Sequence, residues 1–113
     1  MANGGREVEQ AAQMIADGGA VLGCELGSTR IKATLISSEG KPLATGSFGW
    51  ENKLEDGVWT YHMDDVWAGL AACYADLASD VQKQYHVELS RVAAVGISGM
   101  MHGYLAFDSD GEL

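Results

Sequence analysis

Two runs rich in Val, Leu, Ile, Ala and Thr flank a short polar stretch near the start of the chain, in the sequence AVLGCELGSTRIKATLI at residues 20–36. Apolar runs on either side of a short Gly- and Ser-containing stretch indicate a β-hairpin. Residues 42–48 continue as a third strand, with Pro42 near its start, where proline is tolerated. The pattern therefore predicts a three-stranded antiparallel meander.

Two other segments carry apolar residues at helical spacing. The first stripe predicts a short amphipathic helix over residues 6–17, ended by Gly18 and Gly19. The second stripe predicts a long helix from Asp64 or Asp65 to about residue 85, with those acids capping its start. The first stripe is Val8, Ala11, Ala12 and Ile15, and the second is Val66, Leu70, Cys73, Leu77 and Val81. Residues 51–60, before the second helix, are polar and read as irregular.

An almost unbroken apolar run, VAAVGI at residues 92–97, follows the long helix. Such a run is typical of a strand that is buried on both faces and parallel to an earlier strand, so we expect it beside the first strand. A right-handed crossover then brings the loop at residues 98–103 to the same carboxyl-end edge of the sheet as the bend at residues 27–30, where α/β sheets bind ligands. Residues 104–107 predict a further strand and residues 108–111 a turn.

Composition narrows the class of protein. A chain of 113 residues with 47% hydrophobic content is of ordinary size for one domain. The net charge of −9 argues against a nucleic-acid partner or an anionic membrane. Two cysteines form no disulfide framework, and neither a signal peptide nor a long uncharged apolar span is evident. We therefore expect a soluble, cytoplasmic protein.

The bend of the first hairpin concentrates groups that suit a phosphate and a metal ion. They are Glu25, Gly27, Ser28, Thr29, Arg30 and Lys32. Successive backbone N–H groups in a turn form a concavity that binds anions, and Mg²⁺ is usually held through carboxylates together with substrate phosphates. A plain surface turn, in which the Ser, Thr and Gly only satisfy the backbone, is about equally consistent with these residues alone.

His102 stands between glycines after two methionines, as Gly99-Met100-Met101-His102-Gly103. One interpretation is a side chain directed at the hydroxyl groups of a ligand; the other is a loop histidine with its ring nitrogens in water. The spacing of His, Cys and carboxylates predicts no structural zinc site, and no GxSxG sequence predicts a serine nucleophile.

The order of these signals resembles the FGGY carbohydrate kinases, within the superfold of actin, sugar kinases and the Hsp70 ATPase, and most resembles the xylulokinase-like branch. Glu25-Leu26-Gly27-Ser28-Thr29 matches the Asp-x-Gly-Thr-Ser/Thr phosphate motif of that family, and residues 99–103 match its Gly-x-Met-His-Gly loop. The resemblance covers residues 20–113 and leaves residues 1–19 as an N-terminal helical extension. It implies an α/β, RNase H-like half-domain, with the meander, one parallel strand and a helix on one face.

The resemblance also implies roles for particular residues. Gly27, Ser28, Thr29, Arg30 and Lys32 would lie against the phosphates of ATP, Glu25 would face Mg²⁺, and Met101, His102 and Trp59 would contact a sugar. The implied reaction transfers the γ-phosphoryl of ATP to a hydroxyl of a ketose or polyol. The catalytic base of the family lies beyond residue 113, so we expect no catalytic residue here and no activity from this piece alone.

Two departures from the family pattern concern the metal and the sugar. Glu25 replaces the usual aspartate, and residues 60–63 lack the acids often found after the tryptophan. A non-catalytic nucleotide-binding protein of the actin and Hsp70 type, or a scaffold module without a nucleotide site, remain the alternatives. Because elements that would cover one sheet face and pair the last strand are absent from these residues, we also expect self-association.

Overall fold

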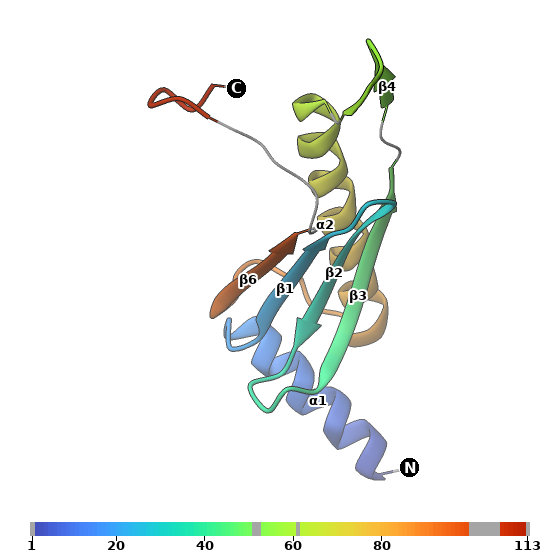
Figure 1. Cartoon of the computed structure of the whole chain (residues 1–113). Coiled ribbons are helices and arrows are strands. Elements are labelled where there is room, and N and C mark those ends of the chain that lie inside the picture. Colours follow the sequence, from blue (N-terminus) through green and yellow to red (C-terminus); the bar gives the residue numbers. More distant parts are fainter. Residues whose placement is uncertain (1, 51–52, 61, 100–106, 113) are drawn as a thin grey trace.

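The computed structural model describes residues 2–50, 53–60, 62–99 and 107–112 (Figure 1). Its elements, in chain order, are α1 (Ala2–Ala16), β1 (Val21–Leu26), β2 (Arg30–Ile36), β3 (Pro42–Gly49), β4 (Lys53–Glu55), β5 (Val58–Thr60), α2 (Met63–Tyr85) and β6 (Ala94–Gly99). Four strands form the main sheet in the order β3-β2-β1-β6, and β4 and β5 form a separate hairpin. Neither described helix is long and apolar enough to cross a membrane.

The main sheet has the predicted topology. β1 and β2 are antiparallel, with Glu25 opposite Lys32, and β3 continues the meander on the other side of β2. β6 is parallel to β1 and in register with it, so that Leu26 lies beside Gly99. The antiparallel meander and the parallel fourth strand are therefore both confirmed.

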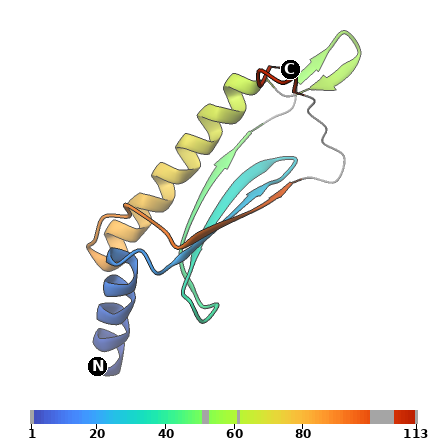
Figure 2. The same cartoon turned by 90° about the vertical axis from the view of Figure 1, so that its left-hand side faces the viewer.

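α2 covers one face of the sheet, over β2 and β3 (Figure 2). Side chains alternate between the two faces of a strand, and Ile31, Ala33 and Leu35 of β2 are buried on the face that α2 covers. The core consists of Ile15, Ala20, Ile31, Ala33, Leu35, Leu43, Ala44, Cys73, Leu77, Val81 and Leu89. The apolar stripe of α2 that the sequence predicted thus supplies the helix side of the core.

Gly46 lets the backbone of α2 lie directly on β3. A Cβ atom at Gly46 would lie 2.4 Å from the backbone nitrogen of Leu77 and 2.5 Å from the carbonyl oxygen of Cys73. A Cβ atom at Gly69, on the helix, would lie 2.8 Å from Cδ1 of Ile31, the end of a flexible side chain that can shift. Gly46, which faces backbone atoms, therefore sets the distance between helix and sheet.

Two carboxylates of α2 cover the outer edge of β3. Asp80 accepts a hydrogen bond of 2.9 Å from the backbone N–H of Thr45, and Asp76 accepts one of 2.9 Å from the backbone N–H of Ser47. Unpaired N–H groups on an edge strand invite pairing with another chain. These two bonds satisfy two of the backbone N–H groups on that edge.

β6 contradicts the expectation of burial on both faces. All six of its residues are exposed, with Val95 at 55% and Ile97 at 73%. The reason is the placement of α2, which packs over β2 and β3 and leaves β6 uncovered among the described residues. An apolar run predicts a strand, but not what lies against it.

The start of α2 also differs from the prediction that an aspartate caps it. The N-cap residue is His62, whose side chain makes no capping hydrogen bond, and Asp64 and Asp65 lie in the first turn. Carboxylates in a first turn still interact favourably with the helix dipole. The side chain of His62 instead contacts a carboxylate oxygen of Glu55 at 2.6 Å, which links the helix start to β4.

The segment predicted to be irregular forms the hairpin of β4 and β5. Asp56 and Gly57 connect the two strands with positive φ angles of 49° and 79°. Asp-Gly with positive φ at both positions is the preferred sequence of a tight two-residue hairpin turn. The signal was therefore present in the sequence, and the prediction of an irregular segment is wrong.

α1 begins at Ala2, four residues earlier than predicted, and ends before Gly18 as expected. Gly18 has φ of 74°, and the N–H of Gly19 bonds the carbonyl of Met14 at 2.9 Å, which is the pattern of a Schellman C-cap. Ile15 is fully buried, whereas Val8 is 43% exposed. Only the last part of the helix is thus anchored in the core.

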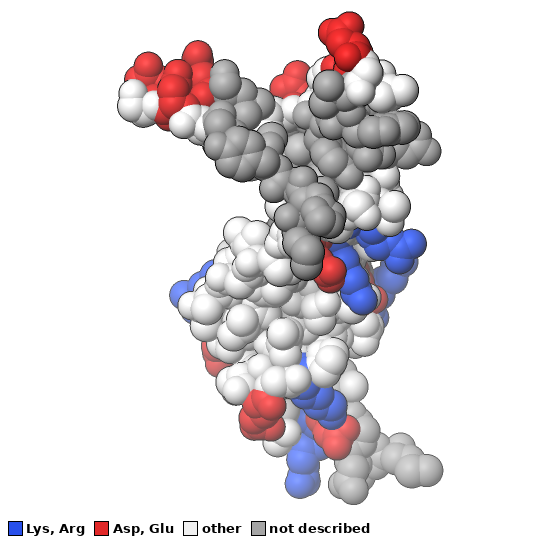
Figure 3. Space-filling model, viewed as in Figure 1, with Lys and Arg blue, Asp and Glu red and all other residues white. Residues whose placement is uncertain are grey.

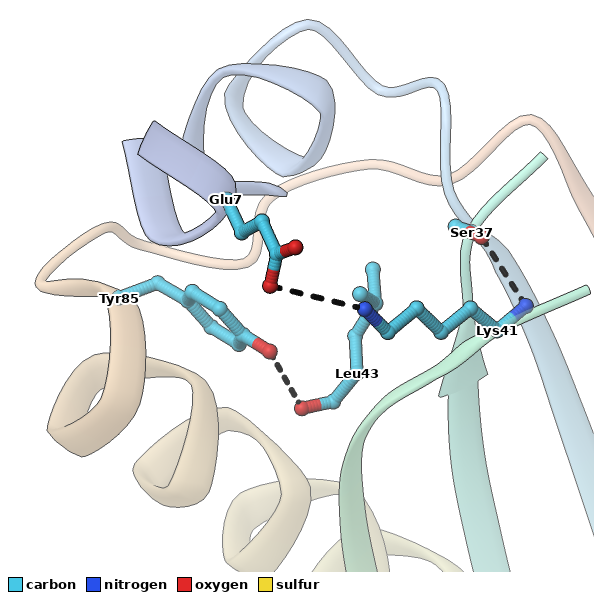
Figure 4. Close-up of polar contacts among 5 residues, drawn as sticks. All are labelled: Glu7, Ser37, Lys41, Leu43 and Tyr85. Atoms are coloured by element: carbon cyan, nitrogen blue, oxygen red, sulfur yellow. Dashed lines mark hydrogen bonds and ion pairs between the residues drawn. The ribbon is translucent and has the colours of Figure 1, made fainter. Parts of the chain in front are cut away.

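The polar contact that α1 makes with the β2–β3 turn stabilises the helix less than the burial of Ile15 does (Figure 4). Glu7 and Lys41 form an ion pair of 4.0 Å with both side chains largely exposed, and such pairs contribute little. The neighbouring hydroxyl of Tyr85 donates a hydrogen bond of 2.7 Å to the carbonyl of Leu43. Burial, with a smaller effect of Asp80, raises the pKa of Tyr85.

The last predicted features are only partly within the described residues. The turn at residues 108–111 is present, with a hydrogen bond of 3.0 Å from the N–H of Gly111 to the carbonyl of Asp108. Residues 104–106 of the expected strand lie outside the described part of the chain.

We predict that Gly46→Ala lowers the free energy of unfolding of the 113-residue chain by about 3 kcal/mol, because the added methyl group overlaps backbone atoms of α2. Gly49→Ala is the matched control, since nothing lies within 4 Å of a Cβ atom there, and it should change stability by less than about 0.5 kcal/mol. Urea unfolding followed by circular dichroism measures both. Equal effects of the two substitutions would contradict the close approach of helix and strand.

We propose that isolated chains associate through the exposed strand β6. Sedimentation velocity over a concentration series should show oligomers, and Ile97→Lys should reduce them because a charge on an exposed strand opposes pairing. Trp67→Lys is the control, since Trp67 is 63% exposed but lies on α2. A monomer at every concentration would argue against the proposal.

Candidate functional site

The bend between β1 and β2 forms a hollow of about 230 Å³. Its lining residues are Glu25, Gly27, Ser28, Thr29, Arg30 and Lys32. These are the six residues that the sequence singled out around the first hairpin. The structure therefore brings them together in one place.

The hollow lies at the end of the hairpin and extends over the sheet face opposite α2. Ile31 is buried under α2, so its neighbours Arg30 and Lys32 extend to the other face. The pairing of the strands places Glu25 between Lys32 and Ser98 on that same face. In Figure 3, basic side chains gather on this face near the end of the hairpin, next to an acidic side chain.

Gly27 is required by the shape of the bend. Its N–H donates a hydrogen bond of 2.9 Å to the carbonyl of Arg30. A Cβ atom at Gly27 would lie only 2.9 Å from that same carbonyl oxygen, closer than real Cβ contacts. A side chain there would therefore push the bend apart.

Trp50 is a residue of this region that the sequence analysis missed. Its backbone N–H donates a hydrogen bond of 3.1 Å to the carbonyl of Thr29, and its indole Nε1–H donates one of 2.8 Å to the carbonyl of Gly27. The ring is half-buried against the core. The sequence offers only a general signal for such a contact. A partly buried tryptophan needs a hydrogen-bond acceptor for its N–H, but the sequence does not show which group that is.

The charges of the hollow differ from those of the whole chain. The chain carries a net charge of −9, whereas the hollow is lined by two cationic side chains and one carboxylate. Burial raises the pKa of the neighbouring Cys24 thiol, which packs against the core and does not line the hollow. The hollow thus has an excess of positive charge on an acidic protein, which suits an anion.

The second predicted bend is located only by the strand that leads to it. β6 ends at Gly99, directly beside Leu26 at the end of β1. Met101 and His102 lie outside the described residues. Trp59 lies in β5, within the range where only the backbone is described, so the structure leaves its contact with a sugar untested.

The lining residues fit the phosphates of a nucleotide and an accompanying Mg²⁺ in chemical type. Hydroxyls, backbone amides and two cations suit phosphate oxygens, and Glu25 supplies one carboxylate. No group of three His, Cys, Asp or Glu side chains converges within the described residues, so a metal here would depend on phosphate oxygens and water for its other ligands. Sites for whole drug-sized ligands measure about 300–1,000 Å³, so the hollow accommodates only part of a nucleotide.

Comparison with known families identifies the chain. The model of the FGGY family of carbohydrate kinases, N-terminal domain, matches residues 20–113. The chain belongs to this family. A search of curated proteins finds no significant match.

Solved structures share the fold. A xylulose kinase from Brucella ovis aligns with a TM-score of 0.67 at 20% identity over 82% of this chain and 19% of its own. A xylulose kinase and a gluconate kinase from Lactobacillus acidophilus each align with a TM-score of 0.62 at 22% identity, over 82% of this chain and 18% of theirs. The chain thus spans about a fifth of the length of these proteins. The expected architecture, an RNase H-like α/β half-domain of the actin-like ATPase superfold, is confirmed.

Proposed function

We propose that the intact protein is an ATP-dependent sugar kinase, which transfers the γ-phosphoryl of ATP to a hydroxyl of a xylulose-like ketose or polyol. The observation that carries this proposal is the alignment of two strand ends. The bend with its hollow lined by Arg30 and Lys32 follows β1, and the strand that leads to Met101 and His102 ends beside it at Gly99. The donor and acceptor sites of a phosphoryl transfer must lie next to each other, and both bends leave the sheet at this one edge.

The hollow is the proposed site for the nucleotide phosphates. Gly27, Ser28 and Thr29 would contribute amide and hydroxyl donors, and Arg30 and Lys32 would neutralise negative charge. Glu25 would hold Mg²⁺, directly or through water, and the ion when bound supplies neutralisation of the developing phosphate charge. Glutamate is one methylene longer than the aspartate of the family pattern, so its carboxylate extends further from β1.

The acceptor site is proposed at the second bend. Met101 and His102 would contact the sugar, and Trp59 would lie near the same ligand. The His102 ring would donate hydrogen bonds to sugar hydroxyl groups or accept hydrogen bonds from them. The names of the solved relatives support a ketose or sugar acid as the class of substrate. Residues 1–19 would then be an N-terminal extension outside the kinase domain, and a cytoplasmic location agrees with ATP as the donor.

The 113 residues alone are proposed to be inactive. The hollow accommodates only part of a nucleotide, and these residues contribute no group to deprotonate the acceptor hydroxyl in this account. The chain also spans about a fifth of the length of the solved kinases that share its fold. Sugar-dependent ADP release by the purified 113-residue chain would overturn this part.

The nucleotide site can be tested with two lysines of the same sheet region. We expect Lys32→Ala in the intact protein to raise the KM for ATP about tenfold, because it removes a charge-assisted contact to phosphate. The matched control is Lys41→Ala, at the other end of β2 and largely exposed. A panel of ketoses and polyols first identifies a sugar that supports turnover. Initial rates of ADP release with that sugar, at a series of ATP concentrations, then give the KM for ATP of both variants. Equal KM values for the two variants would exclude the hollow as the phosphate site.

The sugar site has its own test. Replacing His102 by Ala in the intact protein should raise the KM for the sugar about tenfold and leave the affinity for MgATP unchanged, because the lost hydrogen bonds concern the acceptor alone. Coupled-enzyme kinetics at saturating ATP measure the first quantity and calorimetry the second. If the substitution alters nucleotide affinity and no sugar supports turnover, a non-catalytic nucleotide-binding protein becomes the better description.

A further inference from the structure

Trp50 joins the end of β3 to the phosphate bend by two hydrogen bonds. Its backbone N–H bonds the carbonyl of Thr29 at 3.1 Å and so extends the pairing of β2 and β3 by one residue. This bond fixes the position of the Trp50 backbone relative to the bend. The indole then reaches across to the carbonyl of Gly27, at 2.8 Å from Nε1.

Near the bend, the Trp50 ring and the hollow lie on opposite faces of the sheet. Phe48, two residues before Trp50, lies on the face covered by α2, where it approaches Gly69. Side chains two residues apart in an extended strand share a face, and the Trp50 ring accordingly packs against the core. The hollow, in contrast, extends over the opposite face, with Glu25 and Lys32.

The bond from the indole determines how the peptide between Gly27 and Ser28 is oriented. No described peptide bond is cis, and in a trans peptide the carbonyl and the N–H point in opposite directions. Because the carbonyl of Gly27 points toward the Trp50 indole, the N–H of Ser28 points toward the side of the hollow. The same bond keeps a carbonyl oxygen, which would repel a phosphate, directed away from the hollow.

We propose that Trp50 is a positioning residue for the bound phosphates, acting through the peptide between Gly27 and Ser28. The inference rests on the proposed function, because it assigns the N–H of Ser28 to a phosphate oxygen in the hollow. The indole touches neither the nucleotide nor the sugar in this arrangement. Its effect is to hold the bend in the orientation that an anion requires before the anion binds.

The test uses the intact protein and a pair of tryptophan substitutions. Trp50→Phe keeps a smaller aromatic ring in the core and removes the indole N–H, and Trp67→Phe, which makes the same change on the exposed face of α2, is the control. Calorimetry with the magnesium complex of the non-hydrolysable analogue AMP-PNP should give a Kd about fivefold higher for Trp50→Phe, in line with the loss of one hydrogen bond. Trp67→Phe should bind as the wild type does, and the melting temperatures of all three proteins should agree within about 2 °C.

A spectroscopic signature separates positioning from simple structural support. In intact wild-type protein labelled with ¹⁵N-tryptophan, the Trp50 indole resonance should shift when magnesium AMP-PNP is added, while that of Trp67 should not. With the label confined to residues 1–113 by segmental ligation, three tryptophan resonances are present, and Trp59→Phe and Trp67→Phe assign them by elimination, so this measurement does not depend on the folding of Trp50→Phe. A Trp50 resonance unaffected by the bound analogue, or equal Kd values for Trp50→Phe and Trp67→Phe, would overturn the inference alone. Wild-type protein that binds no AMP-PNP would overturn the proposed function together with it.

Discussion

The parallel hydrogen-bonded ladder between β1 and β6 is the constraint on which the proposed site depends. It holds the two strands in register from Val21 and Ala94 to Leu26 and Gly99. The bend after β1 and the segment after β6 consequently leave the sheet side by side, although more than seventy residues separate them in sequence. A phosphate site and an acceptor site can adjoin only because parallel strands end at the same edge.

The packing of α2 complements this arrangement on the other side of the sheet. Gly46 brings the helix backbone against β3, and the helix then covers β2 and β3 on one face only. Glu25 and Lys32 lie on the face opposite α2, which no described helix covers, and the hollow opens there. The same asymmetry leaves β6 exposed in these residues, so the accessibility of the site and the exposed apolar strand have one structural cause.

Sequence reasoning predicted the parts of the fold that depend on local pattern. The hairpin around Gly27, the apolar stripe of α2 and the strand β6 follow from periodicity and turn residues, which act over a few positions. The β4–β5 hairpin carried an equally local signal in Asp56 and Gly57, which the prediction overlooked. The contact of Trp50 with Gly27 had no local signal, because it spans 23 residues and depends on how the ends of β1 and β3 are brought together.

The central claim is that one edge of the sheet holds both the transferred phosphoryl group and its acceptor. A crystal structure of the intact protein with Mg²⁺, AMP-PNP and a sugar that supports turnover tests it most directly. We expect the γ-phosphate in the hollow at Ser28 and Thr29, on the face opposite α2, with the sugar at His102 beside it. A γ-phosphate bound elsewhere, or a sugar on the far side of the sheet from the hollow, would show that this edge does not hold both groups.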